Sequence, residues 1–416
     1  MIFFIAIISL IVSTDTAFCR DKYQSFHMKP EDITAVLNSV LEHSAPQLAD
    51  TMPDICFGCA DVKYDHGTFK IVECGDGIYM SLRATDVIMN KKKYNLVAPF
   101  WGLLWHTLHQ LNLPTWHVGG ITDKNALAIS ESKKLNVNYA PSLKVLADDE
   151  YFQAAISKSS QLPVSINQSA GIIVYVAPMN REKQRDGKEY KEFRTKYPQF
   201  LYVNSTARAY LKQKDMTYNL FTRAGLSRFI PTFGVLPTMY NPATAFTIRS
   251  LIPNADLMVI KPTFSSLSYG VNIINQARLE PFLKLILQDS AKIPRLAHRS
   301  LSYWKYSKQA HFVASEYVPS QIIYKDGNPY DPTMRVMYIM YHNQGVIHVN
   351  VLGGFWKIPV KPLNESLANP TETHVTIAHA GDYFSGILLE QAESLRMKQL
   401  MAPVLAKAYE QMLIER

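Results

Sequence analysis

Cysteine is scarce in this chain of 416 residues, with only four, at positions 19, 56, 59 and 74. So few in so long a chain exclude a fold held by a framework of disulfide bonds. Cys56 and Cys59 have the spacing of a redox or zinc-binding pair, but the sequence lacks the second ligand pair that a structural zinc site needs. We therefore expect both thiols to pack in the core.

Long apolar runs are also lacking, except at the start. Residues 1–12 (MIFFIAIISLIV) are apolar but too short to span a bilayer, and small residues alternate around residues 17–19. This pattern predicts a cleavable export signal over residues 1–19, although no Lys or Arg precedes the apolar run. A wrongly assigned start or a buried first strand would look the same, which leaves a cytoplasmic location open. No later run is long enough to cross a bilayer, so we expect no stable membrane insertion.

Three sequons bear on the same question. They begin at Asn167, Asn204 and Asn364. A sequon that receives a glycan lies in a surface loop of an exported protein. Export from a eukaryotic cell therefore predicts glycans at all three positions.

Low-complexity tracts and repeats of fixed period are absent from the sequence, and 47% of the residues are apolar, so the chain can bury the cores of two or three domains. Lys and Arg exceed Asp and Glu by 43 to 35, a net charge of +8. That balance suits nucleic acid, an anionic membrane or phosphorylated small molecules. Residues 295–311 are basic and include Tyr and Trp that could stack on bases, but an exposed strand or helix rim has the same pattern. We expect no nucleic-acid binding.

The first half of the sequence has an α/β pattern. Residues 69–74 are typical of a strand, residues 100–111 of a helix, and residues 171–178 (GIIVYVAP) of a buried parallel strand. A short strand at residues 200–203 is followed by Asn204, which with the next two residues is expected to cap a helix that runs to Leu211.

The second half has an α+β pattern with antiparallel character. Helices are predicted over residues 215–224, 276–288 and 389–416. Strands are predicted over residues 230–236, 257–260, 269–274, 311–318 and 335–341. The predicted domain organisation is an export signal at residues 1–19, an N-terminal α/β region at residues 20–198, and a core at residues 199–416.

The strongest chemical motif is LMVIKPTFSSLSYGV at residues 257–271. An apolar strand here delivers Lys261, and a loop of serines and a glycine follows before the next strand. Backbone N–H groups and hydroxyls of such a loop can close over phosphates, beside an ammonium at the strand end. Downstream come VASEYVP, with Glu316, and a strand that opens with Arg335.

This order resembles the ATP-grasp superfamily, in which a lysine-proline strand, a small-residue loop, a glutamate-bearing hinge strand and a downstream arginine enclose the nucleotide. Upstream, Lys214 at the start of a helix and the strand IPTFGVLP at residues 230–237 resemble the entry to this core. The resemblance covers about residues 199–386. It implies an ATP-grasp fold and ATP as cofactor.

The resemblance also implies roles for single residues. Lys261 would hold the α- and β-phosphates, with Lys214 as the second lysine. Arg335 would meet the γ-phosphate or an acyl-phosphate, where a planar multidentate cation serves better than a point charge. The loop over the phosphates would supply Ser265, Ser266, Ser268 and Gly270.

At the hinge, Glu316 and the backbone of Tyr317 and Val318 would line the adenine and ribose pocket by the same resemblance. Farther along, Lys357, His379 and Asp382 match the substrate side of the family weakly. A structural role for each of these three is as good an interpretation.

A magnesium site is predicted from the first half of the chain. Asp61, a tight turn and FKIVECGDG with Glu73 resemble the metal-binding hairpin that eukaryotic-type glutathione synthetases carry on the N-terminal side of a circularly permuted core. Magnesium prefers hard oxygen ligands and bridges phosphates to one or two carboxylates. Gly75 stands where the family has Asn, which removes one oxygen ligand that Asp76 or Asn350 could replace.

The implied reaction is that of a carboxylate-amine ligase. ATP and Mg²⁺ would activate a small-molecule carboxylate as an acyl-phosphate, which an amine then attacks. Two alternatives stay open at this point: an ATP-grasp kinase that phosphorylates a hydroxyl, and a secreted nucleotide-binding pseudoenzyme that lost a metal ligand at Gly75. A homodimer is also left open.

Overall fold

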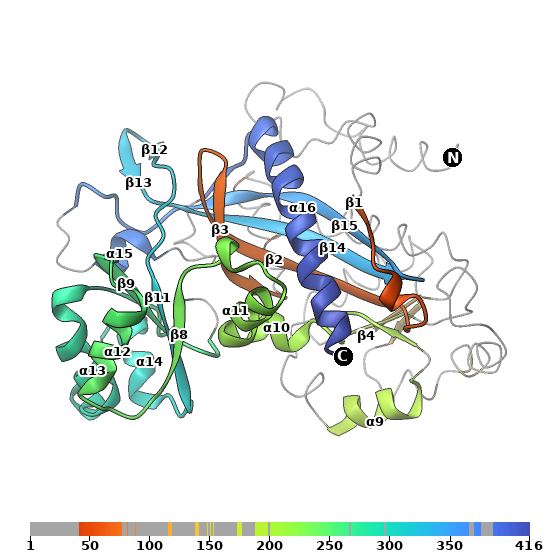
Figure 1. Cartoon of the computed structure of the whole chain (residues 1–416), viewed down its shortest axis with the longest axis horizontal. Helices are drawn as coiled ribbons and strands as arrows, with labels where there is room; N and C mark the ends of the chain where they lie inside the picture. Colours follow the sequence, from red (N-terminus) through yellow and green to blue (C-terminus); the bar gives the residue numbers. More distant parts are fainter. Residues whose placement is uncertain are drawn as a thin grey trace.

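The computed structural model describes residues 41–76, 188–198, 200–265, 268–294, 297–365, 370–375 and 386–416. It also describes three short strands and a few single positions between residues 81 and 176. The described part mixes helices with antiparallel and parallel strands (Figure 1). The predicted fold class, α/β and α+β, is therefore confirmed.

A large antiparallel sheet forms the centre of the described molecule. Its strand order is β1-β15-β14-β2-β3, with β16 paired to β15. The strands are β1 (Leu41–Ser44), β2 (Asp54–Asp65), β3 (Thr68–Gly75), β14 (Thr333–Asn343), β15 (Val346–Lys357) and β16 (Gly386–Leu388). Strands β2 and β3 form the hairpin predicted around Asp61 and Glu73, and β2 pairs with β14 from the far end of the sequence.

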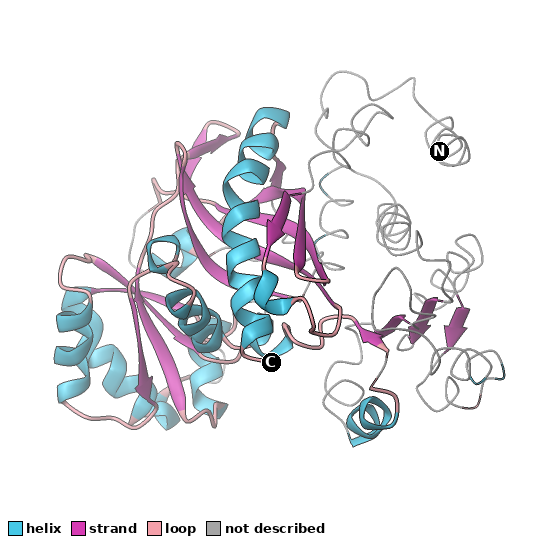
Figure 2. Cartoon of the chain, turned by 45° about the vertical axis from the view of Figure 1, so that its right-hand side comes forward, coloured by secondary structure: helices cyan, strands magenta, loops and turns pink. Residues whose placement is uncertain are grey.

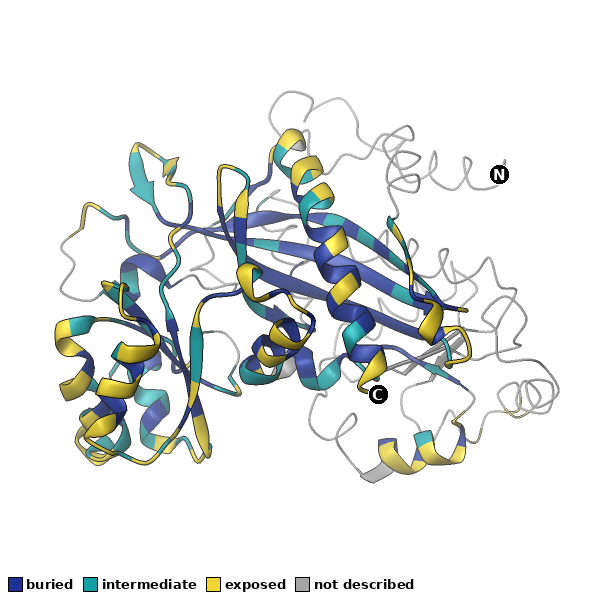
Figure 3. Ribbon diagram, viewed as in Figure 1, coloured by how far each residue is buried: buried dark blue, intermediate teal, exposed yellow. Residues whose placement is uncertain are grey.

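One face of this sheet is apolar and packs under helices. Side chains alternate along a strand, so Ala60 and Val62 of β2 point to this face together with Val336 of β14. The helix α16 (Gln391–Ile414) crosses it, and α11 (Lys214–Arg223) packs beside it (Figures 1 and 3). Glu390 and Glu393 form a capping box that fixes the start of α16.

A second antiparallel sheet lies beside the first, with the order β10-β9-β11-β8. Its strands are β8 (Phe233–Pro237), β9 (Leu257–Pro262), β10 (Asn272–Asn275) and β11 (His311–Glu316). Helices α12 (Ala243–Leu251), α13 (Leu279–Leu287) and α14 (Arg299–Tyr306) cover its outer face and share one apolar core with it. The inner face, which carries Lys261 and Val313, turns toward the large sheet (Figure 2).

A third, parallel sheet has the order β5-β4-β6-β7. The strands are β4 (Thr115–Val118), β5 (Asn138–Ala140), β6 (Ile173–Val176) and β7 (Leu201–Tyr202). Strand β6 confirms the parallel strand predicted within residues 171–178. The charged stretch that follows contains the helix α9 (Lys188–Lys196).

The predicted cap at Asn204 is wrong. The helix α10 (Arg208–Lys212) begins after Ala207 and has no side-chain cap. Asn204 instead takes a left-handed backbone conformation (φ 60°) and bonds through its side chain to the N–H and the carbonyl of Phe57. The local Asn-Ser-Thr pattern favours a cap, but a distant strand with free backbone groups competes for the same amide.

No helix in the described part of the chain is long and apolar enough to cross a membrane.

Candidate functional site

Lys261 lies between the two antiparallel sheets. It stands near the end of β9, and its Nζ donates hydrogen bonds to the carbonyl of Val72 (3.0 Å) and to the hydroxyl of Tyr218 (2.7 Å). Val72 is the extra residue of a β-bulge in β3, because Asp61 pairs with Glu73 while Val62 pairs with Ile71. A bulged residue leaves the ladder unpaired, so its carbonyl is available to the lysine.

The ammonium of Lys261 is costly to keep charged at this place. Its side chain is 5% exposed, and burial, with the nearby charge of Lys214, lowers the pKa of Lys261 to about 7. Glu73 and Asp61 act in the opposite direction. A bound polyanion would supply the counter-charge that this amine lacks.

Lys214, the predicted second lysine, is close to the same place. It starts α11 and is 4% exposed, and its Nζ donates to the carbonyl of Ser265 (2.7 Å) and lies 3.4 Å from a carboxylate oxygen of Glu73. The structure thus brings together Lys214, Lys261 and Glu73, which stand far apart in the sequence.

Arg335 and Asp61 form a partly buried ion pair on the large sheet. They face one another in register on β14 and β2, and the guanidinium donates from Nε and Nη2 to the two carboxylate oxygens at 2.7 and 2.9 Å. Lys357 of β15 adds a third bond, 2.5 Å from Oδ2. Burial alone would raise the pKa of Asp61, but the charges of Arg335 and Lys357 hold it below its ordinary value. Lys357, only a weak match in the sequence, is therefore part of this ion group.

The loop predicted to cover phosphates is described in part. Ser265 accepts bonds from Lys214 through its carbonyl and its hydroxyl, whereas Ser266 lies outside the described residues. Ser268 and Gly270 both have a left-handed backbone, with φ of 60° and 75°. A Cβ on Gly270 would stand 2.5 Å from a ring carbon of Pro262, so only glycine fits there.

At the hinge, the predicted groups already have partners within the chain. Glu316 accepts bonds from the ammonium of Lys70 and from the N–H of Thr232. The N–H of Tyr317 is bonded to the carbonyl of Leu257 at 3.0 Å. Val318 follows directly in the chain, and its role in lining the adenine and ribose pocket stays a prediction.

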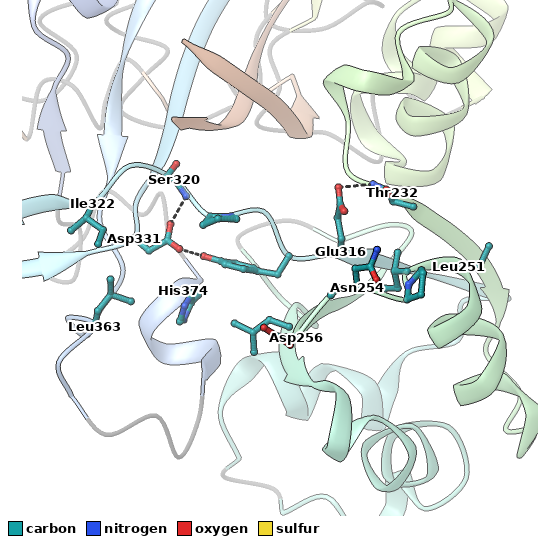
Figure 4. A pocket seen from close by; sticks show the side chains of 16 residues that line it. Thr232, Leu251, Asn254, Asp256, Glu316, Ser320, Ile322, Asp331, Leu363 and His374 are labelled. Atoms are coloured by element: carbon teal, nitrogen blue, oxygen red, sulfur yellow. Dashed lines mark hydrogen bonds between the residues drawn. The ribbon is translucent and has the colours of Figure 1, made fainter. Parts of the chain in front are cut away.

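A cavity of about 630 Å³ opens beside the hinge (Figure 4). Glu316, Tyr317 and Asp331 line it, and Leu257 of β9 lies on the same wall. Leu257 and Lys261 share the inner face of β9, four residues or about 13 Å apart. The cavity and the lysine therefore lie along one strand face.

A buried network behind this cavity was missed at the level of sequence. Lys63 of β2 is 5% exposed and donates to Asp331 (2.8 Å), to the hydroxyl of Tyr317 (3.1 Å) and to the carbonyl of Pro332 (3.0 Å). The hydroxyl of Tyr317 also donates to Asp331. The ring of His374 packs edge-on against the ring of Tyr317. Alternation along β2 places Lys63 on the same face as Asp61, which is the signal that could have singled it out.

The predicted magnesium ligands fit a metal poorly. Both oxygens of Asp61 are already bonded to cations, and Glu73 is the more accessible of the two, with 35% of its side chain exposed. Among the described residues, no group of three His, Cys, Asp or Glu side chains could hold a metal ion. With the carboxylate of Asp61 taken by Arg335 and Lys357, Asp61 and Glu73 do not form the predicted site.

The two thiols with the spacing of a redox or zinc-binding pair lie on one strand. Cys56 and Cys59 are both buried in β2 and three residues apart, so they point to opposite faces and form no pair. Burial raises the pKa of each thiol. His379 and Asp382 lie outside the described residues, as does the predicted export signal.

The glycosylation expected at Asn204 does not fit the fold. Asn204 is 2% exposed, and both the oxygen and the nitrogen of its side-chain amide are hydrogen-bonded to the backbone of Phe57 in β2. Asn364 is exposed, and Asn167 lies outside the described residues. Of the two described sequons, only Asn364 can present its amide to solvent.

No protein-family model and no curated protein matches the sequence. Solved structures similar to the chain include a D-cycloserine synthetase with a TM-score of 0.36 and 11% identity, over 72% of this chain and 82% of that one. A putative gamma-glutamylcysteine synthetase from Methylobacillus flagellatus has a TM-score of 0.40 and 9% identity, over 92% and 93%. D-alanyl-alanine synthetase A from Vibrio cholerae has a TM-score of 0.33 and 9% identity, over 72% and 81%. All three are named as synthetases.

Proposed function

We propose that the chain is an ATP-grasp ligase that activates a small-molecule carboxylate with ATP and joins it to an amine. The observation that carries this proposal is the cluster of Lys214, Lys261, Arg335 and Lys357 between the sheets. These four cations face two carboxylates, those of Asp61 and Glu73. An excess of buried positive charge favours a polyanion such as a triphosphate.

The shape of the site supports a nucleotide lying along β9. Its base and ribose would occupy the cavity lined by Glu316 and Tyr317, and its phosphates would reach Lys261 about 13 Å away. The cavity wall combines the Tyr317 ring with apolar side chains such as Leu257 and Ile322, which suits a flat base.

The chain's own contribution to the reaction would be positioning and charge neutralisation. Lys214 and Lys261 would hold the phosphates, and Arg335 would stabilise the charge that develops as the phosphoryl group moves to the carboxylate. The amine would then attack the carbonyl carbon of the acyl-phosphate and displace inorganic phosphate, which leaves the amide. Magnesium stays a prediction of the resemblance, and no step here depends on it because Asp61 is not available to it.

The test is nucleotide affinity measured by calorimetry. Lys261→Ala should weaken ATP binding by about 1.5 to 3 kcal/mol, because it removes a charge-assisted contact in a partly desolvated place. Lys305→Ala is the matched control, since Lys305 donates to the carbonyl of Ile293 beside the outer helices. Equal ATP affinity in wild type and Lys261→Ala would refute the proposal.

A nucleotide-binding pseudoenzyme is the second candidate. It is favoured by Gly75, which has no side-chain oxygen to bind a metal, and by the two cations that are bonded to the carboxylate of Asp61. A panel of carboxylates and amines distinguishes the candidate functions. The ligase releases inorganic phosphate in step with amide formation, whereas a kinase phosphorylates a hydroxyl. A pseudoenzyme binds ATP without turnover.

We also propose that the chain is exported, on the basis of residues 1–19. Sequencing the N-terminus of protein from its native source checks this, with a start near Arg20 expected. In a eukaryotic host the exposed Asn364 should then carry a glycan and the buried Asn204 should not. A start at Met1 in cytosolic protein would contradict export.

A further inference from the structure

The ion group of Asp61, Arg335 and Lys357 departs from the metal-binding role that the sequence predicts for Asp61. Three N–H groups reach the two carboxylate oxygens, at 2.5, 2.7 and 2.9 Å. A magnesium ion would need one of these oxygens at about 2.0 to 2.1 Å. It would then stand next to an ammonium and a guanidinium of like charge, with no described group between them.

The arrangement follows from the backbone register of three neighbouring strands. Asp61 and Arg335 are direct partners across β2 and β14, and Lys357 follows on β15, two positions beyond the partner of Arg335. Because neighbouring strands fix the three Cβ positions, the carboxylate stands within reach of both cations. Asp61 is therefore placed for its two cations rather than for a metal.

The contacts leave one edge of the guanidinium for another ligand. Arg335 uses Nε and Nη2 for Asp61, which leaves Nη1 unused in that pair, and 15% of its side chain is exposed. Lys357 approaches the same carboxylate from the next strand and is 4% exposed. The two cations are thus held side by side on the face that meets Lys214 and Lys261.

We infer that Asp61 is a positioning residue of the proposed nucleotide site, which holds Arg335 and Lys357 together as a cradle for a phosphate or carboxylate group and takes no metal itself. This inference rests on the proposed function. Asp61 acts through its two cations, which it orients and whose charge it partly offsets. The sequence pattern alone, with Asp61 opposite Glu73, indicated the opposite role.

The test compares Asp61→Asn with Asp54→Asn. Asp54 is also a buried carboxylate of β2, but it is bonded to Thr206 and Tyr409 at the other end of the strand. Two affinities are measured for each protein: Mn²⁺ in the presence of ADP, and inorganic pyrophosphate in EDTA. Asp61→Asn should leave the Mn²⁺ affinity within twofold of wild type and tighten pyrophosphate binding at least fivefold, because Arg335 and Lys357 lose their anion. Asp54→Asn should change neither affinity.

A loss of Mn²⁺ affinity beyond twofold in Asp61→Asn would show that Asp61 binds the metal and overturn the inference. Unchanged pyrophosphate binding would overturn it as well, since the two cations would then not face the anion. If Asp61→Asn fails to fold, the double variant Asp61→Asn with Lys357→Met restores the charge balance. It should fold and bind Mn²⁺ as wild type does. A double variant that does not fold, or that binds Mn²⁺ more weakly, would contradict the inference. Wild-type protein that binds pyrophosphate but not ADP would reject the proposed function, while the pyrophosphate comparison would still decide the role of Asp61.

Discussion

Two ends of the space between the antiparallel sheets carry opposite arrangements of charge. Where β9 ends, the large sheet supplies the carboxylates Asp61 and Glu73, and cations outnumber them. Where β11 ends, the same face of the sheet supplies the cations Lys63 and Lys70, and each is paired with a carboxylate that lines the cavity beside the hinge, Asp331 and Glu316. One end is thus left with excess positive charge and the other is balanced.

This difference gives the site a direction. A ligand with a polyanionic end and an uncharged aromatic end is favoured in one orientation only, with its phosphates at Lys261 and its base in the cavity beside Tyr317. Charge complementarity of this kind selects orientation more than it adds affinity. Three predictions test whether the two ends behave as differently as their charges indicate.

The largest effect is expected at the balanced end. Asp331→Ala leaves the buried ammonium of Lys63 without its carboxylate, and loss of one partner of a buried ion pair costs about 3 to 5 kcal/mol of folding free energy. Denaturant unfolding measures it. Asp289→Ala, which breaks a pair with the exposed Lys292, is the control and should cost under about 1 kcal/mol. A small loss in Asp331→Ala would mean that this end is not held by the pair.

An intermediate effect is expected from pH at the positive end. Because the pKa of Lys261 is lowered to about 7 from 10.5, the unfolded chain binds a proton between these values that the folded chain does not. The contribution of Lys261 to stability without ligand therefore rises as the pH increases from 7 to 10. Its contribution to triphosphate affinity falls over the same range, by up to about tenfold per pH unit, as the amine becomes neutral.

Calorimetric affinity and unfolding free energy, both measured from pH 7 to 10, check these opposite trends. Lys261→Met is the control, since it keeps the bulk of the side chain and removes the titrating group. If the wild type and this variant follow the same two pH curves, Lys261 is not the group that titrates.

The smallest effect sharpens the comparison by separating base from phosphate. Glu316→Gln should weaken ATP by about 0.5 to 1.5 kcal/mol, because Glu316 lines the hinge cavity and a neutral amide replaces its hydrogen-bonding charge. Inorganic tripolyphosphate, which has no base, should bind this variant as it binds wild type. Lys261→Ala should weaken both ligands alike. A loss of tripolyphosphate affinity in Glu316→Gln would place the phosphates at the wrong end.

Much of the fold could be predicted because its signals are local. The apolar strand before Lys261, the hairpin around Asp61 and Glu73, and the helix that begins at Lys214 each have a pattern within one segment. The lysines also converge as the motif order implies, since each stands at the end of a predicted element.

The rest could not be predicted because it depends on pairs that are distant in the sequence. Lys63 and Asp331 are 268 positions apart, and Asp61 and Arg335 are 274 positions apart. No local period reports which strand lies beside which. The wrong prediction at Asn204 has the same origin, because its side chain leaves the expected cap for the backbone of Phe57 on a distant strand.

The bulge at Val72 has a consequence for how this hairpin can vary in length. Strict alternation would send Phe69, Ile71 and Glu73 to one face, yet the first two are in the core while Glu73 pairs with Asp61 on the charged face. The additional residue shifts the phase of β3 once, between Ile71 and Glu73. Removing or inserting one residue between them would turn either the core residues or Glu73 to the wrong face. We therefore expect the hairpin to tolerate a change of one residue in length only at the turn beyond Asp65, where Gly67 already has a left-handed backbone.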